Sequence, residues 1–258
     1  MKKYLLLCTA LTISSSAYAA LDCATPPTCE EWGFTMTTSD CAGKFVLRCP
    51  REPNNDNAVF CDGENVTSIE CSLGSILYDD LKCYNLDSVP EDKEPIAVVF
   101  DTTNRLAIRL NDASSTMKWS SASSDISGLT NYTTSSTALT ETTTGKQNTA
   151  TIIALGGDYS SSSYAPGYCY NLTEGGQTEG SWFLPNLKEL KAIYDNKPTI
   201  DTALTNAGGS TFTNSYYWSS TEYGSNYAWF LSVINGGMGN ILKTISGTNP
   251  YVRCGIKY

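Results

Sequence analysis

The stretch "YYWSSTEYGSNYAWFLSVINGG", residues 216–237, combines closely spaced aromatic side chains with Ser, Thr, Asn and Gly. Alternation of residue types from Trp229 to Ile234 predicts a β-strand, and Asn235-Gly236 is a preferred pair for a tight hairpin turn. The alternation assigns Trp229, Leu231 and Val233 to a buried row and Phe230, Ser232 and Ile234 to an outward row. We therefore expect a hairpin with one buried side.

The first half of this stretch is expected to serve the core. Trp218 and Trp229 are large aromatic side chains whose polar N–H needs a partner when buried. The hydroxyls that follow, of Ser219, Ser220 and Thr221, are of the kind that satisfies buried backbone groups in loops. We expect Glu222 to belong to the same internal network.

The outward positions mix apolar side chains with Ser, Thr and Asn, as recognition surfaces do. Past the turn, residues 238–246 are expected to continue this exposed surface, and Tyr side chains can border it as rigid amphipathic anchors. The predicted ligand-binding residues are Tyr216, Tyr223, Tyr227, Phe230, Ser232, Ile234, Met238, Asn240, Ile241, Leu242, Thr244 and Ser246. The plainer alternative is that these side chains only decorate a sheet edge.

Other segments indicate a mixed α+β domain. The run "PIAVVFDTTNRLAIRL" (95–110) predicts a β-hairpin with one buried face. Two helices are expected, one through 163–172, carrying a cysteine, and one through 184–196, with its apolar residues on one face. Residues 199–209 suggest a short capped helical turn that ends at a Gly pair, and 251–258 suggest a last strand.

Residues 111–163 are dominated by Ser, Thr, Asn and Gly. Such low complexity is typical of a disordered linker. However, Trp119, Ile126, Leu129 and Tyr132 recur at intervals that suit ordered loops held by apolar anchors. We favour ordered loops over a linker.

The N-terminus indicates export. Lys2 and Lys3 precede an apolar run and a small-x-small cleavage site, which predicts a signal peptide over 1–19. The segment 20–72 is rich in cysteine and poor in apolar periodicity, so we expect a small module held by disulfides. Cys83, just beyond it, could bridge back into this module, and 87–95 resembles a charged connector.

Nine cysteines remain after the signal segment, an odd number that leaves one thiol free or paired outside the chain. The chain has no His and no C-x-x-C spacing, so no metal site is expected. The net charge of −9 and a pI near 4.5 argue against nucleic-acid binding, which needs a basic face. No stretch is long and apolar enough to predict a transmembrane segment.

The motifs "SWFLPNLKELKAIYDN", "YYWSSTEYGSNYAWFLSVINGG" and "YVRCGIKY" together resemble the bacterial family typified by the C-terminal domain of Lcl collagen-like adhesins. The resemblance extends over about residues 73–258. It implies a C-type-lectin-like domain in which two helices pack on small antiparallel sheets with long loops, here preceded by the disulfide-rich module of 20–72. It also implies a disulfide between Cys169 and Cys254.

Domains with this fold are the usual variable proteins of diversity-generating retroelements. In those systems adenine-rich Asn codons are randomised near the C-terminus. The outward residues of 230–249 are nearly all types that such codons yield, with Met238 and Lys243 as departures. The resemblance therefore suggests that the face is diversified.

These observations predict a ligand-binding protein of adhesion type, secreted, periplasmic or at the cell surface, with a protein or glycan ligand. No cofactor and no catalytic residue are expected, because the lack of His excludes Ser-His-Asp and Cys-His nucleophiles. One alternative is a structural envelope or fibre subunit. A second is an oxidase like the formylglycine-generating enzymes, which share the fold and use reactive cysteines.

Overall fold

A computed structural model describes residues 68–245, 247 and 249–258 of the chain. The predicted signal peptide (1–19) and nearly all of the predicted cysteine-rich module (20–72) lie outside these residues. The chain divides into two compact units. The described part of the first is residues 68–69 and Tyr84–Asp92, with the 3₁₀-helix η1 (Leu86–Ser88). The second unit, Glu70–Cys83 and Lys93–Tyr258, contains all other elements.

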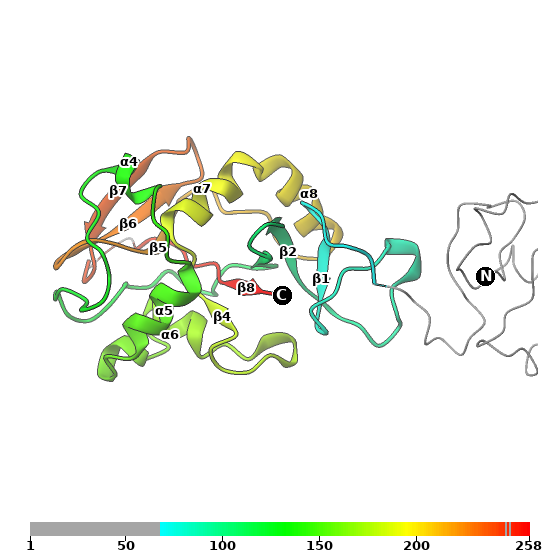
Figure 1. Ribbon diagram of the computed structural model, residues 1–258, viewed down its shortest axis with the longest axis horizontal. Coiled ribbons are helices and arrows are strands. Elements are labelled where there is room, and N and C mark those ends of the chain that lie inside the picture. Colours follow the sequence, from blue (N-terminus) through cyan, green and yellow to red (C-terminus); the bar gives the residue numbers. More distant parts are fainter. Residues whose placement is uncertain (1–67, 246, 248) are drawn as a thin grey trace, which may run out of the picture. The chain divides into compact units, whose positions relative to one another are not determined.

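Two antiparallel sheets form the second unit (Figure 1). The first sheet has five strands in the order β1-β2-β3-β8-β4, and the second has three in the order β5-β6-β7. The strands are β1 (Ile76–Tyr78), β2 (Pro95–Asp101), β3 (Leu106–Arg109), β4 (Trp182–Phe183), β5 (Tyr216–Gly224), β6 (Tyr227–Ser232), β7 (Met238–Leu242) and β8 (Gly255–Lys257).

Five α-helices and two 3₁₀-helices complete the second unit. They are α4 (Ser135–Ala138), α5 (Gly145–Ile153), η2 (Gly157–Ser160), α6 (Ala165–Tyr170), η3 (Glu174–Gly176), α7 (Leu187–Asp195) and α8 (Lys197–Asn206). The predicted helices correspond to α6 and α7, which confirms both. The third predicted segment is longer than a turn, because α8 has ten residues before Gly208 at φ +76°.

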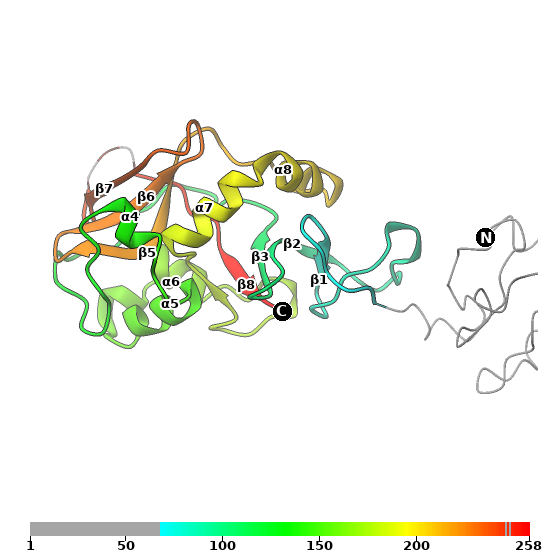
Figure 2. The ribbon, with the colours of Figure 1, turned by 45° about the horizontal axis from the view of Figure 1, so that its top comes forward.

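Helix α7 lies between the two sheets in both views (Figures 1 and 2). Its first turn is fixed by a capping box: the Asn186 side chain accepts from the backbone N of Glu189 at 2.8 Å, and Glu189 accepts from Asn186 N at 2.9 Å. Leu187, Leu190 and Ile193 recur on one face and are buried. That face joins the two sheets in one core, which includes Val98, Ile108, Trp229 and Leu231.

The expected hairpin of 95–110 exists as β2 and β3, but it has no solvent face. Residues Ile96–Phe100 of β2 are buried without interruption, and Ala107 on β3 is as inaccessible as its neighbours. The reason is that the helices α7 and α8 and the 3₁₀-helix η3 all pack against β2, in addition to the strands that pair with it. The single-face expectation was wrong here.

The region of low complexity is ordered, as we expected. Trp119 and Ile126 are fully buried, and α4 and α5 form within it. Helix α5 was not predicted, because its buried residues include Asn148 and Thr149 and so it shows no apolar stripe. Its N-terminus is fixed by a capping box between Thr144 and Gln147.

The hairpin from β6 to β7 also exists, but the connection is longer than a two-residue turn. Residues 233–237 form the loop, with the Gly236 N–H donating to Ser232 O at 2.8 Å and Gly236 at φ +72°. In the described part of the chain, no helix combines the length and the apolarity needed to cross a membrane.

Candidate functional site

The register of the second sheet divides the predicted binding residues between its two sides. Residues paired across antiparallel strands project from the same side. Leu231 pairs with Met238, Trp229 with Asn240, and Tyr227 with Leu242. Phe230 instead pairs with Gly239, and Ala228 with Ile241. The expectation that residues 238–246 continue one outward face was therefore wrong, because neighbouring strand residues point to opposite sides.

The first side, which we call the tyrosine face, consists of Tyr223, Tyr227, Met238, Asn240 and Leu242. Tyr223 packs edge-on against Trp229, with ring centroids 5.5 Å apart, and against Tyr227 at 6.1 Å. Tyr227 and Leu242 are 38% and 42% exposed, and Asn240 is also exposed. Met238 packs against the core. The tyrosine face is thus accessible at its outer residues and packs directly on the buried side chain of Trp229.

The opposite side, the phenylalanine face, consists of Tyr216, Phe230, Gly239 and Ile241. The rings of Tyr216 and Phe230 are 4.9 Å apart, and Tyr216 is 47% exposed. Phe230 is only half-exposed, since its ring lies across Gly239: a Cβ at that position would come within 2.7 Å of the ring. Phe230 is therefore partly a packing residue.

Four other predicted binding residues have different positions. Ser232 is buried, contrary to expectation, because its short side chain lies opposite Tyr216 and beside the closed loop of 233–237. Ile234 is 61% exposed but lies in that loop, beyond β6. Thr244 is half-buried after β7, and Ser246 lies outside the described residues.

A buried ion pair between Glu222 and Lys243 lies beneath the phenylalanine face, with both side chains fully inaccessible. Lys243 Nζ also donates to Ser124 O at 2.8 Å and lies 4.9 Å from the ring centre of Trp119. Burial raises the pKa of Glu222 and lowers the pKa of Lys243, while their contact opposes both shifts. The expectation that Lys243 points outward was wrong, and the expectation that Glu222 is internal was confirmed.

Three tryptophan N–H groups attach the loops of 111–163 to the second sheet. Trp119 donates to Ser219 O at 2.9 Å, and Trp218 donates to Met117 O at 2.9 Å. Trp229 donates to Tyr132 O at 2.8 Å. Burial of Trp218 and Trp229 confirms their expected place in the core.

The hydroxyls of the YWSST segment fulfil part of their expected role. Ser219 donates to Trp229 O at 2.9 Å. Thr221 accepts from Leu187 N at 2.8 Å and donates to Glu141 at 2.7 Å, so it joins β5 to the start of α7. Ser220 Oγ, in contrast, has no hydrogen-bond partner among the described residues.

Two buried carboxyls stabilise loop and helix ends. Glu141 accepts from Asn148 Nδ2 at 2.8 Å as well as from Thr221, and burial raises its pKa. Glu189 accepts from Gly145 N at 2.9 Å and from Asn186 N, so it joins the first turns of α5 and α7. Burial raises the pKa of Glu189 to about 7.

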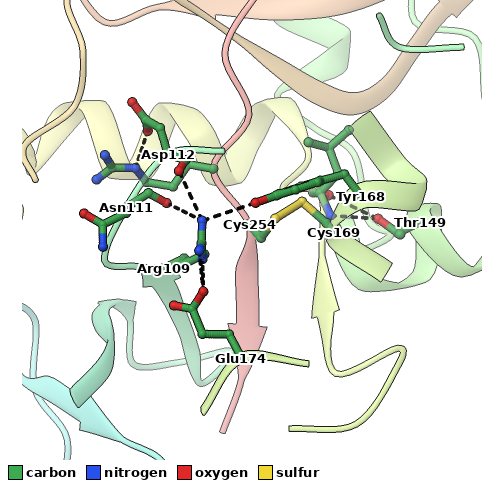
Figure 3. Close-up of a disulfide and its surroundings, with 10 residues drawn as sticks. Arg109, Asn111, Asp112, Thr149, Tyr168, Cys169, Glu174 and Cys254 are labelled. Atoms are coloured by element: carbon green, nitrogen blue, oxygen red, sulfur yellow. Dashed lines mark hydrogen bonds and ion pairs between the residues drawn. A yellow bond between two sulfur atoms is a disulfide. The ribbon is translucent and has the colours of Figure 1, made fainter. Parts of the chain in front are cut away.

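The implied disulfide between Cys169 and Cys254 is present, with a Cα–Cα distance of 5.4 Å (Figure 3). Beside it, Arg109 forms an ion pair with Glu174 and donates to Asn111 O at 3.0 Å and to Asp112 O at 3.2 Å. Both cysteines are fully buried. Neither is a free thiol, so this pair offers no reactive cysteine for an oxidase.

Cys71 and Cys83 form a second disulfide, with a Cα–Cα distance of 5.4 Å. Cys83 thus bridges back, as the sequence allowed. Among the described residues, no group of three or more His, Cys, Asp or Glu side chains could hold a metal ion.

Comparison with known proteins identifies a family and a structural neighbour. The model of the Lcl C-terminal domain matches residues 108–254. A fimbrial protein from Bacteroides ovatus ATCC 8483 has a similar structure, with a TM-score of 0.54 and 16% identity. The match covers 72% of this chain and 49% of that protein, so the chain corresponds to about half of its length. Comparison with curated proteins finds no match.

The family match covers more than half of the chain and includes the YWSST strand, the two helices predicted from sequence and both cysteines of the long-range disulfide. The chain belongs to the family of Lcl C-terminal domains.

Proposed function

We propose that this chain is a non-enzymatic surface protein of adhesion type that binds an extracellular ligand through its second sheet. The family of Lcl C-terminal domains and the fimbrial neighbour support an extracellular role. The main support for this binding site is the distribution of exposed apolar side chains. Seven large hydrophobic side chains of the described residues are exposed, and four belong to this sheet or its loop: Tyr216, Tyr227, Ile234 and Leu242.

The tyrosine face is the best candidate for contact. Its apolar pair of Tyr227 and Leu242 lies next to the hydrogen-bonding side chain of Asn240, and the ring of Tyr223 packs against that of Tyr227. Such rigid aromatic side chains lose little conformational entropy when they bind. The backbone beneath them is anchored by buried Trp229.

The absence of exposed charge indicates the class of ligand. Between Tyr216 and Ile245 only two residues carry a carboxyl or ammonium group, and both are consumed in the buried Glu222–Lys243 pair. The net charge of −9 is therefore carried elsewhere. A face without charge favours a neutral glycan or an apolar protein surface, because a charged ligand would lose hydration without gaining a partner.

The experiment compares the wild type with a Tyr227→Ala/Leu242→Ala variant on an array of neutral glycans and a panel of extracellular-matrix proteins. Leu155→Ala is the matched control, since Leu155 is 46% exposed but lies after α5. We expect the double variant to lose binding with its unfolding temperature preserved, and the control to keep binding. Equal binding by all three proteins, or no binding by the wild type to either set, would contradict the proposal.

We also propose a domain organisation for the whole chain and a mechanism that diversifies the binding face. We propose a signal peptide over 1–19, a cysteine-rich module over 20–72 and a C-type-lectin-like domain over 73–258. Diversification by a retroelement is also proposed, with exposed positions such as Asn240 and Leu242 as its targets. Sequencing of the neighbouring DNA tests this: a reverse transcriptase gene and a near-copy of codons 216–254 are expected, and their absence would exclude diversification.

A structural envelope or fibre subunit is the second candidate, favoured by the likeness to a fimbrial protein. A fibre subunit must join head to tail without closing. Light scattering of the purified chain distinguishes the candidates, because a subunit should form polymers whose mass keeps rising with concentration. A binding protein should reach a fixed mass.

A further inference from the structure

Strand β7 is the outer strand of the second sheet, and only one of its two edges is paired with β6. At one end of the ladder Lys243 N donates to Asn226 O at 2.9 Å, and at the other Ser232 N donates to Gly237 O at 2.7 Å. Hydrogen-bonded pairs alternate along an antiparallel ladder. Ile241 and Gly239 therefore bond to β6, whereas the backbone groups of Met238, Asn240 and Leu242 point away from it.

This outer edge is largely bare. Within the described ranges, the one hydrogen bond to these three backbone positions is from Ile245 N to Leu242 O, at 3.1 Å. Native edge strands are usually protected by Lys, Pro or a bulge. Met238–Leu242 contains neither residue, and its register with β6 is regular throughout. The edge is thus able to accept another strand.

The outer edge of β7 can also pair with the same edge of a second copy of the chain. In an antiparallel pairing of two copies centred on Asn240, Met238 of one copy lies opposite Leu242 of the other, and the two Asn240 residues face each other. All three positions present backbone groups outward, so their hydrogen bonds match in this register. The Asn240 amides, each both donor and acceptor, can bond across the axis. Met238 and Leu242 bring apolar side chains together.

We propose that two copies of this chain associate through their β7 edges in this two-fold register, forming one continuous six-stranded sheet. A second copy fits better than an unrelated strand, because the edge carries no charge to select a partner and its centre is matched by itself. One five-residue strand pair is far smaller than the about 800 Å² per partner of a standard interface. The dimer is therefore weak and forms at high local concentration, as at a surface.

This proposal goes beyond ligand binding, and it has a consequence for the geometry of binding. Side chains opposite each other in an antiparallel pair share a side, so the tyrosine faces of both copies lie on the same side of the joined sheet. A dimer would present two faces to one ligand-bearing surface and gain avidity without a new contact.

The test measures the mass of the full chain by sedimentation velocity between about 10 and 500 µM, with non-reducing electrophoresis to identify covalent dimers. Asn240→Pro removes an outward donor but no bond to β6, a position that an edge strand tolerates. We expect a reversible dimer for the wild type and a monomer for Asn240→Pro. Asn240→Ala, which keeps the backbone donor, is the matched control and should still dimerise.

A second set of variants, which introduces one charge on each side of the proposed contact, tests the dimer without a proline substitution. Met238→Lys alone and Leu242→Glu alone should each weaken the dimer at least about tenfold, by placing a charge against an apolar side chain. The double variant should recover, because each introduced charge then faces its opposite across the axis and not within its own chain. A monomeric wild type at every concentration, or a dimer indifferent to Asn240→Pro or to both single charges, would overturn the proposal.

Discussion

The two sheets treat their edges differently. The outer strands of the first sheet are short: β4 has two residues and β1 three, and β1 is bridged to Cys83, which the disulfide to Cys71 holds in place. In the second sheet, Tyr251 pairs with β5 at one edge, while the outer edge of the five-residue β7 receives one backbone hydrogen bond among the described residues, from Ile245 N to Leu242 O. The first sheet is therefore closed to further strands, and the second has one edge available for contact.

The first prediction about the difference between the sheets concerns the disulfides of the first sheet. Cys169 and Cys254 are 85 residues apart, so replacing both with Ala should cost about 4.5 kcal/mol of unfolding free energy on the chain-entropy model. Cys71 and Cys83 are 12 apart, and their double replacement is the control with an expected cost of about 3 kcal/mol. Denaturant unfolding measures both. A larger loss for the shorter bridge would show that the long-range closure is not what stabilises the first sheet.

The second prediction separates the buried and exposed residues of the second sheet. Trp229→Ala should destabilise the fold by about 4 kcal/mol, because it leaves a cavity and an unpaired Tyr132 carbonyl. Ile234→Ala should change the unfolding free energy by less than about 0.5 kcal/mol. Phe230→Ala should lie between them, since its ring covers Gly239. If all three variants unfold at one denaturant concentration, the assignment of faces is wrong.

The third concerns the ion pair beneath the phenylalanine face. Lys243→Met should cost about 3 kcal/mol at neutral pH, because it leaves the Glu222 carboxylate buried without a counter-charge. Adding Glu222→Gln should recover part of this loss. The single variant should also regain stability relative to wild type as the pH falls, because Glu222 can then be protonated. Thermal unfolding at several pH values measures this, and a loss independent of pH would argue against a charge effect.

The smallest expected effect is a pH dependence from Glu189. Because burial raises its folded-state pKa to about 7, above the ordinary value of 4.5, the folded state binds the proton more tightly than the unfolded state. The contribution is complete below about pH 4.5 and is lost as the pH rises towards 7. We expect wild-type unfolding free energy to fall across this window relative to Glu189→Gln, by at most about 3 kcal/mol at pH 7. If the unfolding free energies of wild type and Glu189→Gln change equally with pH, Glu189 is not the source of the pH dependence.

The sequence was sufficient for features that depend on local patterns or on the family resemblance. The capped apolar face of 187–193 predicted α7, and the Lcl resemblance implied the Cys169–Cys254 bridge. Trp218 and Trp229 were assigned correctly to the core, because large aromatic side chains next to alternating apolar residues are rarely exposed together. The order of 111–163 was inferred from its isolated apolar residues.

Features that depend on tertiary partners were missed. Helix α5 buries the polar residues Asn148, which bonds to Glu141, and Thr149, which bonds to Leu184, so no apolar periodicity marked it. Lys243 looked like a surface residue, because only the fold brings Glu222 and the Ser124 carbonyl to its ammonium group. The division of residues 238–242 between two faces needed the register of β7 against β6. Strand alternation alone could have warned that consecutive residues do not share a side.

The three tryptophan N–H groups that hold the loops of 111–163 have a consequence for how this chain can vary. Trp218 and Trp229 each hold a loop at one backbone carbonyl, and Trp119 holds its own loop to Ser219 O, so the exposed residues between these points are under little constraint of their own. Changes of composition at the exposed positions there should be tolerated, provided that buried residues such as Ile126 are kept. A protease should find these loops resistant despite their linker-like composition, until an indole is removed and its loop is released.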